Sequence, residues 1–268
     1  MVDKSFIEKI EQLAISSAAA PETHVPVCLM PVGTDIHSLE PYMEGRARYR
    51  GKFATQSILD LALYASKFSG GTCFVEQQDM KAGMFFNLGD SVHPGHGDHR
   101  AELKLKRTAT FTAFLQICGQ QHSQKALAEW LEDWADYIVA FTSAGDAIDV
   151  KKAVAAVRRM TISAKSEVTS DQADFKGSRS AMEEIEAKSE HELPAGIRFD
   201  CTPYHGLDGR SFEARLSVIT SDPPKLVLRA IRMEETEELM AQEFADKLKV
   251  ALKSAGAEAD VYLGSFAT

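Results

Sequence analysis

Residues 91–107 read SVHPGHGDHRAELKLKR, and this stretch decides how the middle of the chain folds. In its second half Ala101, Leu103 and Leu105 are apolar, while the residues between them are charged. A period of two is typical of a β-strand that buries one face and exposes the other. The Pro and Gly residues of the first half favour an exposed turn. We therefore expect a polar loop that leads into a half-buried strand.

Outward from this strand, the N-terminal half of the sequence predicts alternating strands and helices. Two strands joined by a polar turn are expected at 72–76 and 83–88. Apolar residues at helical spacing predict helices over 57–68, 108–119, 123–141 and 147–160. Ser57 and Ser123 are suitable N-cap residues for two of these helices. An amphipathic helix with Phe6, Ile10 and Leu13 on one side is expected to end near residue 20.

The C-terminal half has a different character, because its segments are short, β-branched and alternating. Strands are expected at 161–169, 197–203, 211–220 and 225–233, followed by a helix from Met233 to about Ala255 with an acidic first turn. Residues 161–192 favour a long hairpin or arm that docks on a neighbouring subunit, although 181–188 also has helix propensity. We therefore predict an α+β fold: an N-terminal α/β half, then an antiparallel sheet with a long hairpin and a C-terminal helix.

This reading divides the chain into an N-terminal helical arm (1–22), an α/β half (23–148) and a C-terminal half (149–268), with the last two either separate or parts of one continuous domain. The 268 residues carry a net charge of −9 and are 44% hydrophobic, an ordinary globular composition. The four cysteines lie far apart, and neither a signal peptide nor a membrane span is evident. We expect a reduced, cytoplasmic protein that does not contact a membrane.

The loop at 91–100 raises the question of a metal site. His93, His96 and His99 are spaced three apart, and imidazole is a common ligand of transition metals. Pro94, Gly95 and Gly97 exclude a helix here, so this spacing does not place the three rings on one face. We therefore expect no metal at His93, His96 and His99, the candidate ligands that this spacing offers. We predict that Asp98, His99 and Arg100 instead anchor the loop or contact a partner.

Basic residues form a second candidate site, for phosphate or nucleic acid. Guanidinium groups bind phosphate in a bidentate manner, and a tyrosine between them can stack on a base. The alternative is that the alternating arginines lie on an exposed edge strand and keep the protein soluble by preventing aggregation at that edge. The candidate residues are Arg46, Arg48, Tyr49, Arg50, Lys104, Lys106 and Arg107.

No enzyme motif is present in the sequence. It contains no phosphate-binding or dinucleotide-binding glycine motif, no nucleophile elbow and no paired-cysteine or His-Glu zinc motif. The acidic residues of helix 123–141, among them Glu129, Glu132 and Asp136, are interpreted as a solvated face. The sequence thus identifies no catalytic residue and no cofactor, and it leans against an enzyme.

Three segments carry a family resemblance: IHSLEPYMEGRARYRGKFATQSILDLALYASKF (36–68), FNLGDSVHPGHGDHRAEL (86–103) and LAEWLEDWADYI (127–138). In this order and spacing they resemble the YfdQ-type family of phage and prophage proteins, a family of unknown function. The resemblance continues through 180–194 and 212–235, favours a strand near 181–190, and matches DHRA (98–101) to a recurrent family feature. It implies a bacterial phage or prophage gene of the early, non-structural region, and it supplies no catalytic residues.

Two functions follow as expectations. The first is a non-enzymatic accessory protein that assembles into a homo-oligomer, a ring or a shell, because the N-terminal arm and the polar 161–192 segment each need a neighbour to pack on. The alternative is a protein that binds nucleic acid or nucleotides and serves recombination or counter-defence.

Overall fold

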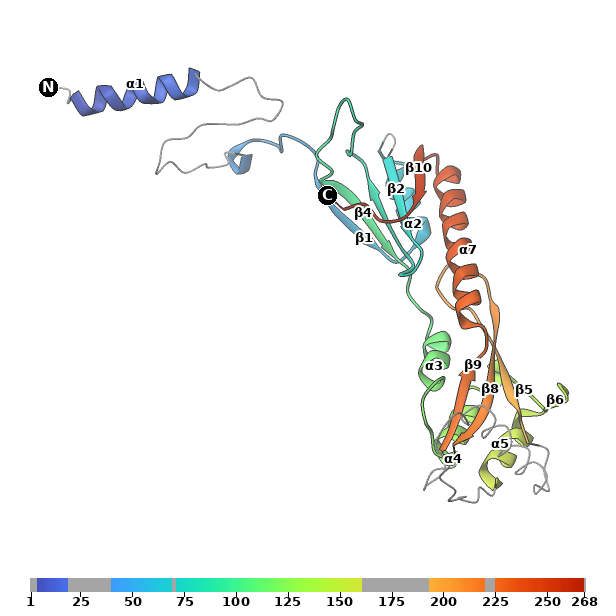
Figure 1. Ribbon diagram of the computed structural model, residues 1–268. Helices are drawn as coiled ribbons and strands as arrows, with labels where there is room; N and C mark the ends of the chain where they lie inside the picture. The colour runs from blue at the N-terminus through green and yellow to red at the C-terminus, as the bar shows by residue number, and fades with distance from the viewer. Residues whose placement is uncertain (1–3, 19–39, 69–70, 161–192, 220–224, 268) are drawn as a thin grey trace. The chain divides into compact units, whose positions relative to one another are not determined.

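The computed structural model describes residues 4–18, 40–68, 71–160, 193–219 and 225–267 (Figure 1). The chain divides into two units, Met1–Tyr49 and Arg50–Thr268. Within the first unit lie α1 (Lys4–Ala18) and a short 3-10 helix, η1 (Glu40–Tyr42). The predicted N-terminal helix is therefore confirmed. Both sheets described here belong to the second unit.

The first sheet has the strand order β1-β4-β3-β2-β10. Its central strand β3 (Lys81–Phe85) pairs antiparallel with β2 (Gly71–Glu76) on one side and with β4 (His99–Lys104) on the other. The two edge strands, β1 (Gly51–Thr55) and β10 (Ala259–Leu263), each pair in parallel with their neighbour. Neither edge strand was expected from the sequence. The last strand of the chain thus completes a sheet that starts at residue 51.

One face of this sheet is covered by helices. α2 (Ile58–Ala65) begins at Ser57, whose side chain accepts a hydrogen bond from the backbone N–H of Asp60, as the sequence predicted for this cap. α2 packs against the sheet and against the last helix, α7 (Met233–Ser254), which begins beside β9 (Lys225–Ala230) and ends beside β10 (Figure 1). Leu61, Leu103 and Phe244 are fully or almost fully buried in this layer.

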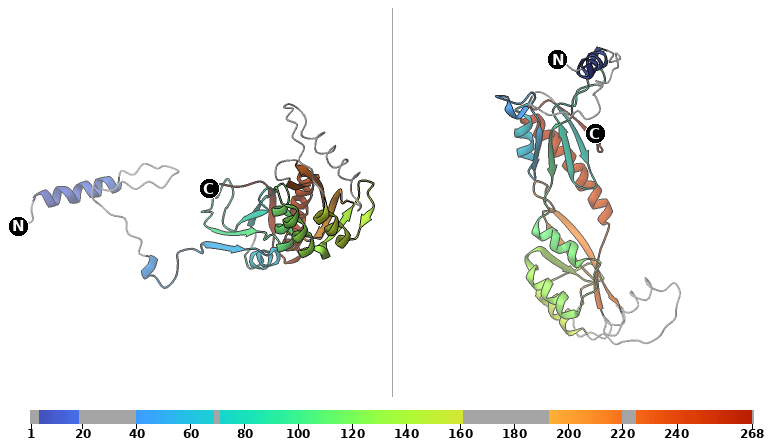
Figure 2. Two further views of the ribbon diagram at one scale, coloured as in Figure 1. Left: turned by 90° about the horizontal axis from the view of Figure 1, so that it is seen from below. Right: turned by 90° about the vertical axis from the view of Figure 1, so that its left-hand side faces the viewer.

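The second sheet is antiparallel throughout, with the order β6-β5-β7-β8-β9. The helices α3, α4 and α5 gather on one side of it (Figure 2, right). Phe114 of α3 lies 5.4 Å from Phe199 and 5.5 Å from Phe212, measured between ring centroids, so aromatic rings form the centre of this core. The bounds are α3 (Ala109–Ile117), α4 (Gln124–Asp133), β5 (Ile138–Phe141), β6 (Ala147–Ile148), α5 (Val150–Arg159), β7 (Gly196–Cys201), β8 (Arg210–Ile219) and β9 (Lys225–Ala230).

The α+β prediction is confirmed, as are the Ser123 cap and the C-terminal helix from Met233. The single helix expected over 123–141 is wrong. It ends at Asp133, and Ile138–Phe141 forms a strand that pairs with β7, because its β-branched residues gain more from the sheet than from a longer helix. The predicted hairpin at 161–192 and the strand at 161–169 lie outside the described residues.

Each sheet contains strands from both sides of the expected boundary near residue 148. β5 and β6, from before this boundary, join the second sheet, and β10, from its end, joins the first. The two sheets are also linked directly, since the N–H of Thr108 donates to the C=O of Pro203 and the N–H of His205 donates to the C=O of Lys106. Residues 50–268 therefore form a single compact unit.

A cluster of charged groups holds α7 to the loop between β7 and β8. The Glu243 carboxylate accepts hydrogen bonds from the Asp208 N–H at 2.7 Å and from the Arg210 guanidinium at 2.5 Å. Lys247, one turn further along α7, donates to the Asp208 carboxylate at 2.7 Å and to the Gly206 C=O at 3.2 Å. Glu243 and Arg210 are largely buried, so their charges depend on each other. Across the described residues, no helix has the length and apolarity that crossing a membrane would require.

We expect Glu243→Ala to lower the free energy of unfolding by roughly 2–4 kcal/mol, because it removes the carboxylate partner of the largely buried Arg210 guanidinium and the acceptor of the Asp208 N–H. Urea unfolding followed by circular dichroism measures this change. The matched control is Glu238→Ala, an exposed glutamate of the same helix, which should stay within about 0.5 kcal/mol of the wild type. Equal effects of the two substitutions would contradict the anchoring role of Glu243.

Candidate functional site

The histidine-containing loop between β3 and β4 is a closed, hydrogen-bonded turn. The N–H of Gly95 donates to the C=O of Leu88 at 2.8 Å, and the N–H of Gly97 donates to the C=O of Asn87 at 3.1 Å. At its tip, the Asp90 carboxylate accepts hydrogen bonds from the N–H groups of Val92 and His93. The loop therefore has a defined shape, which these backbone hydrogen bonds and the Asp90 carboxylate maintain.

Asp98 and Asn87 fasten the base of this loop to the sheet. The Asn87 side-chain amide donates to the Asp98 carboxylate at 2.7 Å, and its oxygen accepts from the N–H of His99 at 3.0 Å. The C=O of Asp98 accepts from the N–H of Gly51, which ties the loop to β1. Asp98 thus anchors the base of the loop in the described structure, and Asn87, which the sequence did not indicate, is its side-chain partner.

His99 is buried in an aromatic pocket beneath the loop. Its Nε2 shares a 3.1 Å hydrogen bond with the Tyr64 hydroxyl, and its ring centroid lies 4.4 Å from that of Phe68 and 4.5 Å from that of Phe86. Burial lowers the pKa of His99 below its ordinary value of 6.5, against a smaller opposing effect of the Asp98 charge. At neutral pH the imidazole is therefore uncharged and serves as a packed polar group.

The three histidines of the loop do not converge. His93 and His96 are exposed on the loop, while His99 is buried under it. Among the described residues there is no group of three His, Cys, Asp or Glu side chains placed to hold a metal ion. Because Pro94, Gly95 and Gly97 exclude a helix, the i, i+3, i+6 spacing does not bring these three rings to one face.

The described cysteines are poor nucleophiles. Burial raises the pKa of Cys73 and of Cys118 to about 12, and that of Cys201 to about 11. Their thiols stay protonated at physiological pH, and the thiolate is the reactive form.

The residues of the predicted basic site belong to both units. Arg46, Arg48 and Tyr49 belong to the first unit, while Arg50 begins the second. Lys104 lies on the exposed face of β4, the same face as Arg100 and Glu102. Lys106 and Arg107 follow β4 and contact the segment after β7. The C=O of Lys106 accepts a hydrogen bond from the N–H of His205, and Arg107 Nε donates to the Tyr204 hydroxyl at 3.2 Å.

Besides Arg100 and Lys104, the open face of the first sheet carries aromatic residues that the sequence did not indicate. The register aligns Arg100 with Phe85, Gly83 with Phe74, and Phe74 with Tyr262 across neighbouring strands. The chain then turns back over this face after β10, and the ring of Phe266 stacks on that of Phe74, with centroids 5.0 Å apart and an interplanar angle of 18°. A hollow of about 570 Å³ lies on this face, between Phe266 and the side chains of β4.

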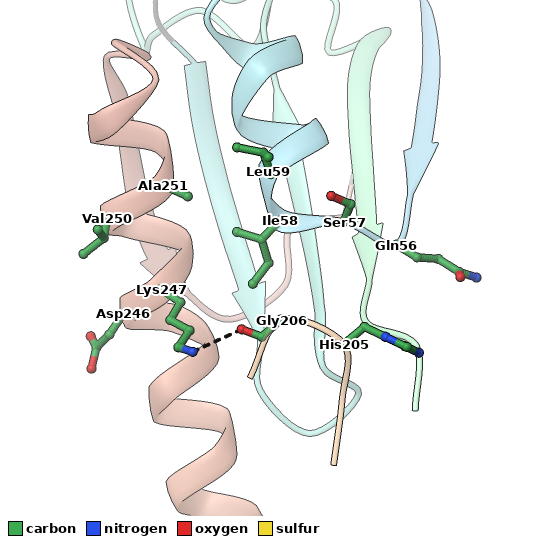
Figure 3. Close-up of a pocket in the computed structure, with 10 residues that line it drawn as sticks. All are labelled: Gln56, Ser57, Ile58, Leu59, His205, Gly206, Asp246, Lys247, Val250 and Ala251. Carbon is green, nitrogen blue, oxygen red and sulfur yellow. Dashed lines mark hydrogen bonds between the residues drawn. The ribbon is translucent and has the colours of Figure 1, made fainter. Parts of the chain in front are cut away.

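A second hollow, of about 560 Å³, lies between α2 and α7 (Figure 3). Ile58 and Leu59 of α2 reach toward α7, where Val250 and Ala251 complete a mainly apolar lining. Lys247 lies at one end, and its ammonium group is already held by Gly206, Asp208 and Glu243. This hollow therefore offers apolar contact more than a charge.

We expect Gly95→Ala to distort the loop, because a Cβ at this position would lie 2.0 Å from the backbone oxygen of Asn87. The expected cost is roughly 2 kcal/mol of stability or more, with faster amide hydrogen exchange in residues 86–98. The control is Gly83→Ala, whose Cβ meets its nearest atom only at 4.0 Å. Unchanged exchange in Gly95→Ala would contradict the closed-turn geometry.

The buried His99 predicts a pH-dependent stability. Its pKa is lower in the folded protein than in the unfolded chain, so the unfolded chain takes up a proton first as the pH falls. Stability should therefore be fully present above about pH 6.5 and decline below it. Urea unfolding between pH 7.5 and 5.5 measures this slope, which His99→Gln should flatten and the exposed His93→Gln should leave as in the wild type. A wild-type slope retained in His99→Gln would show that another group titrates.

Comparison with known proteins gives one match. No curated protein and no solved structure matches the chain. A family model described as "Uncharacterized conserved protein (DUF2303)" matches residues 2–266, nearly the whole sequence. With its two sheets, its anchored histidine loop and its C-terminal strand all inside the matched range, this chain belongs to the DUF2303 family.

Proposed function

We propose that this protein is a non-enzymatic, cytoplasmic accessory protein of phage or prophage origin that assembles into a closed homo-oligomer, a ring or a shell. The phage origin and the cytoplasmic location are supported by the resemblance of residues 36–68, 86–103 and 127–138 to the YfdQ-type family. The non-enzymatic role is supported by the protonated cysteines and by a buried histidine that serves as a packing group. The assembly rests on α1.

The observation that carries the assembly is the uncovered apolar side of α1. Phe6, Ile7 and Ile10 expose 60%, 51% and 51% of their surface. An isolated helix of about 15 residues is marginally stable in water, and most helices are stabilised by packing their apolar face against something else. The residues of α1 belong to a unit separate from Arg50–Thr268. A helix of this kind needs a surface to cover its apolar side.

The hollow between α2 and α7 is the surface that suits α1. Leu59 and Val250 expose 62% and 64% of their surface beside it, and Leu63 of α2 is also exposed. A helix laid into an apolar groove through residues spaced three and four apart is a common mode of recognition. The occupant we propose is α1 of a second copy. Because each copy then gives one helix and receives one, the contact repeats from copy to copy, and it forms a ring where the rotation between copies closes.

We expect the wild-type protein to show a discrete oligomeric mass by light scattering on a sizing column. Ile10→Asp and Val250→Asp should each lower this mass, because each places a charge in the apolar contact. Gln12→Asp adds the same side chain outside the apolar stripe of α1 and should keep the wild-type mass. A monomeric wild type, or full mass in both Ile10→Asp and Val250→Asp, would contradict the proposal.

A mixing experiment separates exchange between copies from docking within one chain. One preparation carries Ile10→Cys and the other carries Val250→Cys with a different affinity tag. Oxidation of the mixture should form disulfide-linked heterodimers if α1 docks on a second copy. A third preparation carries both Ile10→Cys and Val250→Cys in one chain. If the disulfide forms only within this chain and not between the two single variants, α1 covers the hollow of its own chain, and this result would overturn the assembly.

Nucleic-acid binding, the alternative function, is favoured by a different observation: the combination of cations and aromatic rings on the open face of the first sheet.

A further inference from the structure

The open face of the first sheet has an unbalanced basic strand. Strand parity places Arg100, Glu102 and Lys104 on this face, opposite the buried His99, Ala101 and Leu103. The Glu102 carboxylate is paired with Lys52 at 2.6 Å. Among the described residues no ion pair joins Arg100 or Lys104 to a carboxylate. Lys104 has a minor electrostatic interaction with Asp79, whose closer partner is Lys81. Two cations about 13 Å apart along one strand can thus contact a bound anion.

Aromatic rings occupy the adjoining strands of the same face. Phe74 stacks with Tyr262 at 5.9 Å and 27°, and Phe266 stacks over Phe74 and meets Phe85 edge-on at 5.6 Å. This arrangement leaves the outer rings available, since Tyr262 and Phe266 expose 54% and 44% of their surface. Exposed rings on a sheet are a platform on which bases stack without regard to sequence.

Gly83 lowers the centre of this face. It lies between Glu102 of β4 and Phe74 of β2, with no side chain of its own. A Cβ there would meet its nearest atom only at 4.0 Å, so packing does not require glycine. Glycine inside a strand weakens it and often marks a place where another chain approaches closely. This notch lies between the basic strand and the rings, within the hollow of about 570 Å³.

From these three features we propose that this face binds single-stranded nucleic acid. The phosphates follow β4 and contact Arg100 and Lys104, and the bases extend across Gly83 to stack on Phe266 and Tyr262. The cations match the charge of a phosphate backbone and the rings match the flat faces of bases, whereas an acidic peptide would use only the cations. The site lies entirely within Arg50–Thr268, so it does not depend on the assembly through α1.

The test is fluorescence anisotropy of labelled oligo-dT and oligo-rU, titrated with the full chain at several salt concentrations. The two oligonucleotides separate DNA from RNA. We expect binding that weakens with salt. Arg100→Ala and Lys104→Ala should each weaken it and reduce the salt slope by about 0.7, the value for one phosphate contact of a single strand. The matched control is Arg229→Ala, an exposed arginine of β9 on the second sheet.

The aromatic part has its own variants. Phe266→Ala and Tyr262→Ala should each weaken binding by roughly 5- to 100-fold with an unchanged salt slope, while Phe266→Trp should retain it. Gly83→Val should weaken binding, because its side chain fills the notch. The melting temperature should be no lower than that of the wild type, because valine favours a strand and the Cβ has room at this position.

Three results would overturn the proposal. The first is a wild type that binds neither oligonucleotide at low salt. The second is an Arg100→Ala variant that behaves like Arg229→Ala. The third is full displacement of the oligonucleotide by polyglutamate at equal charge, which would mean that the face recognises negative charge alone.

Discussion

The position of α7 depends on one largely buried carboxylate, that of Glu243. It accepts hydrogen bonds from the Asp208 N–H and from the Arg210 guanidinium, and it lies 3.1 Å from the Lys247 ammonium on its own helix. Removing these charges from water is costly, and only the complete set of partners offsets the cost. Within the described residues Arg210 Nε still lacks a hydrogen-bond partner. The cluster therefore fixes where α7 crosses the β7–β8 loop more than it adds net stability.

Both proposed binding surfaces follow from where α7 lies. The helix follows β9 of the second sheet almost directly and then delivers β10 to the first sheet. Its C-terminal half packs with α2 over one face of that sheet, so the apolar hollow forms where the two helices meet. The opposite face keeps its cations and rings toward solvent, and the chain that leaves β10 brings Phe266 across it.

The histidine loop shows how strand parity can outweigh a suggestive spacing. His99 lies on the same face of β4 as Ala101 and Leu103, so it is buried with them. Burial favours the uncharged imidazole, which shares a hydrogen bond with the Tyr64 hydroxyl. His93 and His96 belong to the loop and stay exposed. The anchoring is supplied instead by Asn87 and Asp98, two residues with short polar side chains that bond to each other and to the backbone. The number and spacing of the histidines do not indicate these hydrogen bonds of Asn87 and Asp98.

The sequence by itself determined the elements whose signals are local. The caps at Ser57 and Ser123, the alternation of β4 and the long helix from Met233 depend on neighbours a few residues away, and all four were predicted correctly. The turn before β4 was also predicted, because Pro and Gly residues favour turns. Only the tertiary structure decided the strands at the sheet edges and the helix that ends early. β1, β5 and β10 are short, and their hydrogen bonds go to strands far away in the sequence, so no local pattern specifies them. The same holds for the ring cluster of Phe74, Tyr262 and Phe266, which exists only because β10 pairs with β2 at the end of the chain.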